Sequence, residues 1–310
     1  MAALAFIGVL LLAVDSQPVY AAKTIGMLIP LNSGVTREYE EAFARHLKKY
    51  FLVPEEVKTL AEKTEDNPEA RIRGIHNLVD QRVDVLICFG SSATAEAAEI
   101  SGQIPIIFVG SQNPLTAGLV KDQEKPGKNI TGVTGPISLI VLLKAVVEVT
   151  TAKNVAVIYN PGSEDSLAEM KEIVEMGKKM ALEVRPVDLL NRRPSETSQL
   201  LDPVGFVLMT TSCCRDVDFI PSMDRLLKPV ACWTPTSLCD GAIFSYALDL
   251  EELMAVVASM TERILNGKNP SDIPVKIIKK RTFVIDAKKA AQLKLQIPFS
   301  VFQQATSVSK

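Results

Sequence analysis

The sequence has little of what marks nucleic-acid-binding or membrane-spanning proteins. Its 34 Lys and Arg residues are balanced by 36 Asp and Glu residues, so the formal charge is −2 and no basic surface for nucleic acid is expected. Only 5% of the residues are aromatic, and one of them is Trp. Beyond the first 22 residues, no apolar run is long enough to cross a bilayer. The composition therefore excludes nucleic acid as a partner.

The sequence also lacks the common catalytic motifs. There is no GxSxG nucleophile elbow, no GxxxxGK[ST] phosphate loop and no GxGxxG dinucleotide fingerprint. The two histidines, His46 and His76, lie in the middle of predicted helices, where a solvated or packed side chain is usual. We expect a protein that is not an enzyme and that holds neither a cofactor nor a metal.

The N-terminal segment is typical of an export signal. Residues 3–14 form an unbroken apolar run that is too short to span a bilayer, and the small residues at 19–22 offer a cleavage point near Ala21 or Ala22. We expect a signal peptide over residues 1–22 and a periplasmic or other extracytoplasmic location. No Lys or Arg precedes the apolar run, so an uncleaved anchor remains the alternative.

The stretch most informative about function is 84–94, DVLICFGSSAT. A continuous apolar run ends at Gly90 and is followed by Ser91, Ser92 and Thr94, where an Ala- and Glu-rich helical pattern begins. A run that is apolar on both faces predicts a central strand of a parallel sheet. The hydroxyls then lie at the carboxyl end of that strand, where open α/β sheets bind ligands. Similar strand ends recur at 106–114, 154–166 and 205–214.

Strands and helices alternate in two successive series, the second beginning at Pro136. This order predicts the α/β class, with two doubly wound Rossmann-like lobes, a hinge and an interlobe cleft. We expect an N-terminal lobe of 23–135 plus about 250–272 and a C-terminal lobe of 136–249 plus about 273–310. The chain would cross between the lobes near Pro136 and Asp249. The predicted helices are 36–50, 67–81, 139–150, 163–180, 196–201, 220–227 and 250–265, and the predicted strands include 25–30, 57–60, 105–110, 155–159, 183–189, 206–209, 230–233 and 242–246.

Seven segments, in their order along the chain, resemble one family. These are DVLICFGSSAT, IPIIFVGSQNPLTAGLV, PGKNITGVTG, NVAVIYNPGSEDS, GAIFSYALD, ILNGKNPSDIPV and LKLQIPFSVFQQA. They resemble the substrate-binding proteins of ABC importers in the tryptophan/tyrosine-type "ABC substrate-binding" family, which have the type I periplasmic binding protein fold. The resemblance implies a monomer that captures a small molecule between two closing lobes and delivers it to an ABC permease. The alternative is an exported sensing module for a membrane receptor or kinase.

The resemblance also implies a place for the ligand. In amino-acid binders of this family a hydroxyl cluster at a helix start receives the ligand carboxylate, and the matching positions here are Ser91, Ser92 and Thr94. The alternative is that one of these hydroxyls only caps the helix. Trp233 and Tyr246 are candidate stacking walls, with core packing as the alternative for Trp233. The remaining candidate ligand-binding residues are Ser111, Gln112, Asn113, Asn160, Thr210 and Thr211.

Departures from the family pattern bear on the kind of ligand. Asn113-Pro114 stands where relatives commonly carry Asp-Pro, and no acid follows the strand over 206–209 or the strand over 230–233. An amino acid bound there would bury its ammonium without a partner, at a cost of several kcal/mol. The strand ends therefore favour a neutral or anionic ligand.

The five cysteines are unevenly placed. Cys88 lies in the predicted central strand, where it is expected to act as a small buried apolar residue. The other four, Cys213, Cys214, Cys232 and Cys239, fall within 27 residues. One or two disulfides, free thiols and a thiolate metal site all remain open, although no CxxC pair or nearby His supports a metal.

Overall fold

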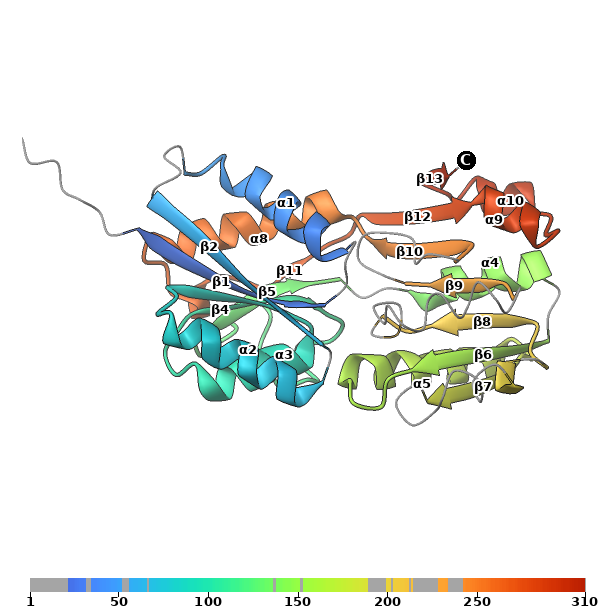
Figure 1. The fold of residues 1–310 in the computed structure, drawn as a ribbon, viewed down its shortest axis with the longest axis horizontal. Coiled ribbons are helices and arrows are strands. Elements are labelled where there is room, and N and C mark those ends of the chain that lie inside the picture. The colour runs from blue at the N-terminus through green and yellow to red at the C-terminus, as the bar shows by residue number, and fades with distance from the viewer. Residues whose placement is uncertain are drawn as a thin grey trace, which may run out of the picture.

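The structure, a computed structural model, describes residues 22–31, 35–51, 56–65, 67–135, 138–150, 153–188, 199–201, 203–211, 213, 228–233 and 242–309. The described residues form two lobes, each built on one mostly parallel sheet with helices beside it (Figure 1). This confirms the predicted α/β class and the two doubly wound lobes. Among the described helices, none combines the length and apolar character needed to cross a membrane.

The first lobe contains a six-stranded sheet in the order β11-β5-β4-β3-β1-β2, with all its strand pairs parallel. Helices α1 and α8 pack together beside it, and α2 and α3 pack together as a second pair (Figure 1). Its elements are β1 (Lys23–Pro30), α1 (Val35–Leu47), β2 (Val57–Thr64), α2 (Pro68–Asp80), β3 (Val85–Phe89), α3 (Ser91–Ile100), β4 (Ile106–Ser111), β5 (Ile130–Thr134), α8 (Leu250–Leu265), η3 (Pro270–Asp272) and β11 (Lys276–Ile277).

The second lobe contains a seven-stranded sheet in the order β13-β12-β10-β9-β8-β6-β7. Strand β12 runs antiparallel to β10, and the other pairs are parallel. Its elements are α4 (Leu139–Thr150), β6 (Asn154–Tyr159), α5 (Glu164–Lys179), β7 (Glu183–Asp188), β8 (Phe206–Met209), β9 (Val230–Cys232), β10 (Phe244–Leu248), β12 (Arg281–Asp286), α9 (Ala287–Gln292), α10 (Phe299–Phe302) and β13 (Ser307–Ser309).

Alternating side chains place the central strands between two helical layers. In β1, Met27 packs with residues of α1 and α8, whereas Leu28 packs with residues of α2 and α3. Strand β3 is buried along its whole length and lies between β1 and β4. Both faces of these strands are therefore in apolar surroundings, which explains their near-continuous apolar sequences.

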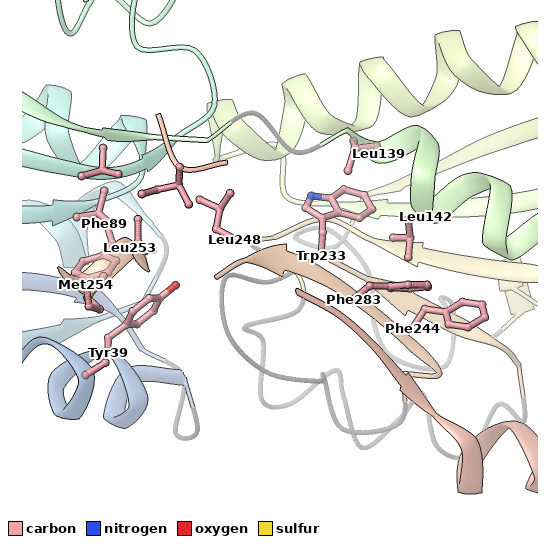
Figure 2. Packing of buried hydrophobic residues seen from close by; sticks show 14 of the residues in the cluster. Tyr39, Phe89, Leu139, Leu142, Trp233, Phe244, Leu248, Leu253, Met254 and Phe283 are labelled. Carbon is pink, nitrogen blue, oxygen red and sulfur yellow. The ribbon is translucent and has the colours of Figure 1, made fainter. Parts of the chain in front are cut away.

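The hydrophobic core continues from one lobe into the other. Tyr39 and Phe89 pack in the first lobe and Trp233 and Phe244 in the second, within one cluster that also contains Leu248 at the end of β10 (Figure 2). The aromatic rings of Tyr39 and Phe89 lie 4.5 Å apart. Apolar packing therefore connects the two lobes in the region where the chain passes from one to the other.

The chain returns to the first sheet later than expected. Strand β11 pairs with β5 and lies beyond residue 272, where the first lobe was expected to end. The first crossing point, Pro136, lies outside the described residues, as do the expected helix at 220–227 and almost all of the expected signal peptide at 1–22. At the expected helix 196–201, the structure describes a helical stretch at 199–201.

Candidate functional site

The candidate site is formed where helix starts from the two lobes meet. Strand β3 ends at Phe89, Gly90 adopts φ 96°, and α3 begins at Ser91. A side chain at position 90 would be strained, because this φ lies in the left-handed region. Gly90 is also the N-cap and makes no side-chain cap bond. The Ser91 N–H at the start of α3 is therefore available to an acceptor from outside the helix.

A carboxylate from the second lobe binds this helix start. The side chain of Asp165, in the first turn of α5, accepts a 2.9 Å bond from the Ser91 N–H and a 2.8 Å bond from the Ser91 hydroxyl. Behind it, the hydroxyls of Ser91 and Ser111 are 2.7 Å apart and both side chains are buried. Negative charge is favourable at a helix N-terminus, so Ser91 forms a good receptor for a carboxylate.

A second acid lies one turn along α5. Glu169 is 3% exposed and accepts bonds from the Thr211 N–H at 2.9 Å and the Thr211 hydroxyl at 2.7 Å. From the first lobe, the Gln112 side-chain amide donates to it at 3.4 Å. Burial raises the pKa of Glu169 to about 7, although the two Thr211 bonds act in the opposite direction. Glu169 is therefore a carboxyl group that titrates near neutral pH at the junction of the lobes.

Trp233 completes this side of the site. It follows β9, its side chain is fully buried, and its carbonyl oxygen accepts a 3.2 Å bond from the Thr211 hydroxyl. Its indole Nε1 has no hydrogen-bond partner within the part of the chain described. The indole lies close enough to Glu169 to lower the pKa of that carboxyl, but the pair lacks hydrogen-bond geometry. Figure 2 shows the nitrogen at the end of the ring that faces the first lobe.

Five of the predicted ligand-binding residues lie at this junction: Ser91, Ser111, Gln112, Thr211 and Trp233. Ser92, beside Ser91, is partly exposed, and the described residues include no hydrogen-bond partner for its hydroxyl. Tyr246, the second predicted aromatic wall, is also partly exposed and packs edge-on against Phe283 at 6.0 Å. A role for these residues in ligand binding stays a prediction.

The remaining predicted residues make local bonds that support the backbone. Thr94 donates to the Gly90 carbonyl at 2.7 Å, and Asn113 accepts from the Thr116 N–H at 3.2 Å in an exposed turn. Asn160 accepts from the Gly162 N–H at 2.8 Å. The hydroxyls of Thr210 and Ser166 are 2.6 Å apart. Of the three hydroxyls after β3, Thr94 thus bonds within its own helix, and Ser91 reaches the other lobe.

Asp165 and Glu169 were not among the predicted site residues. The expectation of a neutral or anionic ligand rested on the strand ends, and the structure brings two carboxylates to the junction from α5 instead. The available signal was their spacing: positions i and i+4 lie on one face of a helix, and this helix follows a strand end. The sequence motif NPGSEDS contains Asp165, but its partner lies 74 positions away.

The cysteine predictions are only partly open to inspection. Cys88, Cys213 and Cys232 are buried, while Cys214 and Cys239 lie outside the described residues, so the disulfide stays a prediction. Burial raises the pKa of the Cys88 thiol to about 12, which agrees with a packed, unreactive side chain. The described residues contain no group of three or more His, Cys, Asp or Glu side chains that could hold a metal.

Solved structures share this fold. The "ABC domain in complex with L-Trp" from Streptococcus pneumonia is 21% identical with a TM-score of 0.82, over 93% of this chain and 100% of that one. A conserved domain protein from Vibrio cholerae is 22% identical with a TM-score of 0.81, over the same shares. A ligand-free, open substrate binding protein from Clostridium difficile is 19% identical with a TM-score of 0.64, over 93% and 99%.

Sequence comparisons identify the family. The "Tyrosine-binding protein" of Clostridioides difficile (strain R20291) is 26% identical over 226 residues, which is 70% of this chain. The match spans 65% of that relative's length. The family described as "ABC transporter substrate binding protein" matches residues 53–309, most of the chain. This chain therefore belongs to the ABC transporter substrate-binding protein family.

Proposed function

We propose that this chain is the extracytoplasmic solute-binding component of an ABC importer. It captures a small molecule between its lobes and delivers it to a permease, without chemical change to the molecule. Family membership and the two-lobed fold support this role. We assign residues 23–135 and 250–277 to one lobe and the rest of the mature chain to the other, because β11 pairs with β5. The working unit is a monomer that opens and closes about its crossing segments.

The observation that carries the proposal is the carboxylate bound at the start of α3. The N–H and hydroxyl of Ser91 hold the two oxygens of Asp165 at 2.9 and 2.8 Å. A ligand carboxylate has the same shape and charge, so the same two donors would hold it between the lobes. The site thus has the donors, the helix dipole and the interlobe position that capture of a carboxylate requires.

The ligand is an amino acid, and an aromatic one is favoured. One relative is named a tyrosine-binding protein, and one structure of the same fold holds L-Trp. Asp165 and Glu169 supply the acidic surroundings that a ligand ammonium needs and that the strand ends lack. The Nε1 of Trp233, which has no hydrogen-bond partner among the described residues, supplies a further donor beside them.

Thermal unfolding with each of the twenty amino acids tests this proposal. A ligand at a hundred times its Kd stabilises the folded state by about 2.7 kcal/mol, so L-tryptophan or L-tyrosine should raise the Tm by several degrees. Calorimetry then gives the Kd of the amino acid that does so. The amino-acid proposal is wrong if none of the twenty raises the Tm. Uptake in vesicles that contain the cognate permease distinguishes delivery from sensing.

A further inference from the structure

The most exposed apolar side chains in the described part of the second lobe lie at its C-terminal end. Helices α9 and α10 and strand β13 lie together there (Figure 1), and residues 287–309 are called the C-terminal cap below. Phe299 is 75% exposed, and Phe302 and Val308 are 37% and 40% exposed. Among the described residues, Phe299 has the largest exposed fraction of any large hydrophobic side chain.

We propose that the C-terminal cap is a contact surface for a membrane that contains anionic lipids. Phe299 and Phe302 enter the headgroup region, and the lysines of the cap bind lipid phosphates. This surface is separate from the interlobe site. It goes beyond the proposed function, because it needs neither a captured molecule nor a permease.

The two phenylalanines lie on one face of a helical turn that the core holds in place. Helix α10 begins at Phe299 and ends at Phe302, and side chains three positions apart in a helix are neighbours. Between them, Val301 is fully buried and belongs to the hydrophobic core. The exposure of the two rings therefore belongs to a packed element of the second lobe.

The charged residues within the cap all have the same sign. The cap contains Lys288, Lys289 and Lys294 but no Asp, Glu or Arg. Lys288 and Lys294 are exposed, and neither forms an ion pair within the part of the chain that the structure describes. Two acids adjoin the cap: Asp286 accepts from the Lys289 N–H at 2.8 Å, and Glu148 of α4 accepts from a hydroxyl of α10 at 2.8 Å. Lys288 and Lys294 thus remain available to phosphate groups.

The charge and the size of this surface favour lipid over another protein. In a symmetric contact, a second copy of the chain would place lysines against lysines. A stable protein interface covers about 800 Å² of each partner, and three partly exposed apolar side chains supply only a fraction of that area. Aromatic side chains with lysines beside them are instead typical of segments that lie in the membrane interface. There a lysine packs its carbon chain on apolar groups and extends its ammonium to the phosphates.

Sedimentation of the full chain with lipid vesicles tests the proposal. One preparation is pure phosphatidylcholine, and the other contains phosphatidylcholine and anionic phosphatidylglycerol in equal amounts. The variants Phe299→Ser and Lys294→Gln alter the cap. Their controls lie in the first lobe: Leu115→Ser removes another exposed apolar side chain, and Lys128→Gln removes another exposed lysine with positive φ, 58° against 56° at Lys294.

The wild type should bind the anionic vesicles about fivefold more tightly than the neutral ones, and high salt should remove the difference. Phe299→Ser and Lys294→Gln should each weaken binding to the anionic vesicles about threefold, and the two controls should match the wild type. The proposal is overturned if the wild type binds neither preparation or binds both equally. It is also overturned if the cap variants bind as tightly as their controls, which is the result that binding through the N-terminal apolar segment would give. A wild-type dimer that Phe299→Ser dissociates, with no binding to vesicles, would assign the surface to a second copy instead.

Discussion

Ser91 donates two hydrogen bonds, from its N–H and its hydroxyl, to the two carboxylate oxygens of Asp165 in the opposite lobe. Ser92, its neighbour, reaches no partner in the described part of the chain. The two serines therefore form a matched pair of positions. They share a residue type and a helix turn, but only one of them joins the lobes.

Ser91→Ala should weaken binding of the amino-acid ligand by roughly 1–3 kcal/mol, since it removes a buried hydroxyl bond. Ser92→Ala should change it much less. The double variant should resemble Ser91→Ala, and calorimetry measures all three. Equal losses from the two single substitutions would contradict the assignment of Ser91 as the receptor. Small-angle scattering of the ligand-free proteins should also show a larger radius of gyration for Ser91→Ala and for the double variant, but not for Ser92→Ala.

Glu169 should make the folded state less stable as the pH rises. Its pKa of about 7 lies above the ordinary 4.5, so the folded protein retains a proton that the unfolded chain has released. The contribution of Glu169 to the free energy of unfolding is therefore greatest below pH 4.5. It declines as the pH rises to about 7. The full shift corresponds to roughly 3 kcal/mol. Glu169→Gln removes the titrating group without removing its acceptor oxygen.

Urea unfolding from pH 5 to pH 8 measures this effect. The free energy of unfolding of the wild type should fall with pH relative to that of Glu169→Gln, because other acids titrate equally in both proteins. Parallel profiles would show that Glu169 titrates normally. The comparison is made without ligand, since a bound ammonium would hold Glu169 ionised.

Arg71 should matter far more to stability than Arg73, two positions away on α2. Arg71 is 5% exposed in its side chain and binds Glu96 of α3 through two bonds of 2.8 and 2.7 Å. Arg73 forms an exposed pair with Glu69 at 4.0 Å. Arg71→Met leaves a partly buried acid alone and should cost about 3 kcal/mol, whereas Arg73→Met should cost less than about 1 kcal/mol. Similar Tm values for the two variants would contradict this.

Cys88 should resist thiol reagents in the folded protein. It is fully buried in β3, and burial raises the pKa of its thiol to about 12. Mass spectrometry after alkylation at pH 8 should find Cys88 unmodified before denaturation and modified afterwards. The same denatured, non-reduced sample counts the thiols. One free thiol would support two disulfides among the other four cysteines, and five would exclude any disulfide.

The sequence predicts those parts of the fold that depend on local pattern. The apolar run before Gly90 predicted β3 and the start of α3, and the predicted helix over 67–81 corresponds to α2, which Asn67 caps. Strand β11 was not predicted, because a two-residue strand has no periodicity to detect. Its place comes from pairing with β5, about 140 positions earlier.

The site was predictable on one side only. Ser91 and Ser111 follow apolar strands, so their positions at the carboxyl edge could be expected from the sequence. The hydrogen bonds between Ser91 and Asp165 depend on how the two lobes are positioned relative to each other. No local sequence pattern predicts that arrangement. From the sequence alone, Glu169 resembles an ordinary solvated Glu on a helix. Only the tertiary structure shows that it is buried beside Thr211 and Gln112, which donate hydrogen bonds to it.

The arrangement of α8 has a consequence for how the protein is made. This helix, Leu250–Leu265, packs against α1 and supplies Leu253, Met254 and Val257 to the core beside the first sheet. During synthesis the first lobe lacks that layer until the ribosome has translated residues 250–265. A nascent chain released at residue 249 would hold the strands β1 to β5 with an uncovered apolar face. The N-terminal lobe therefore depends on a helix that is translated long after β5, and chaperones have that interval in which to engage the uncovered apolar face.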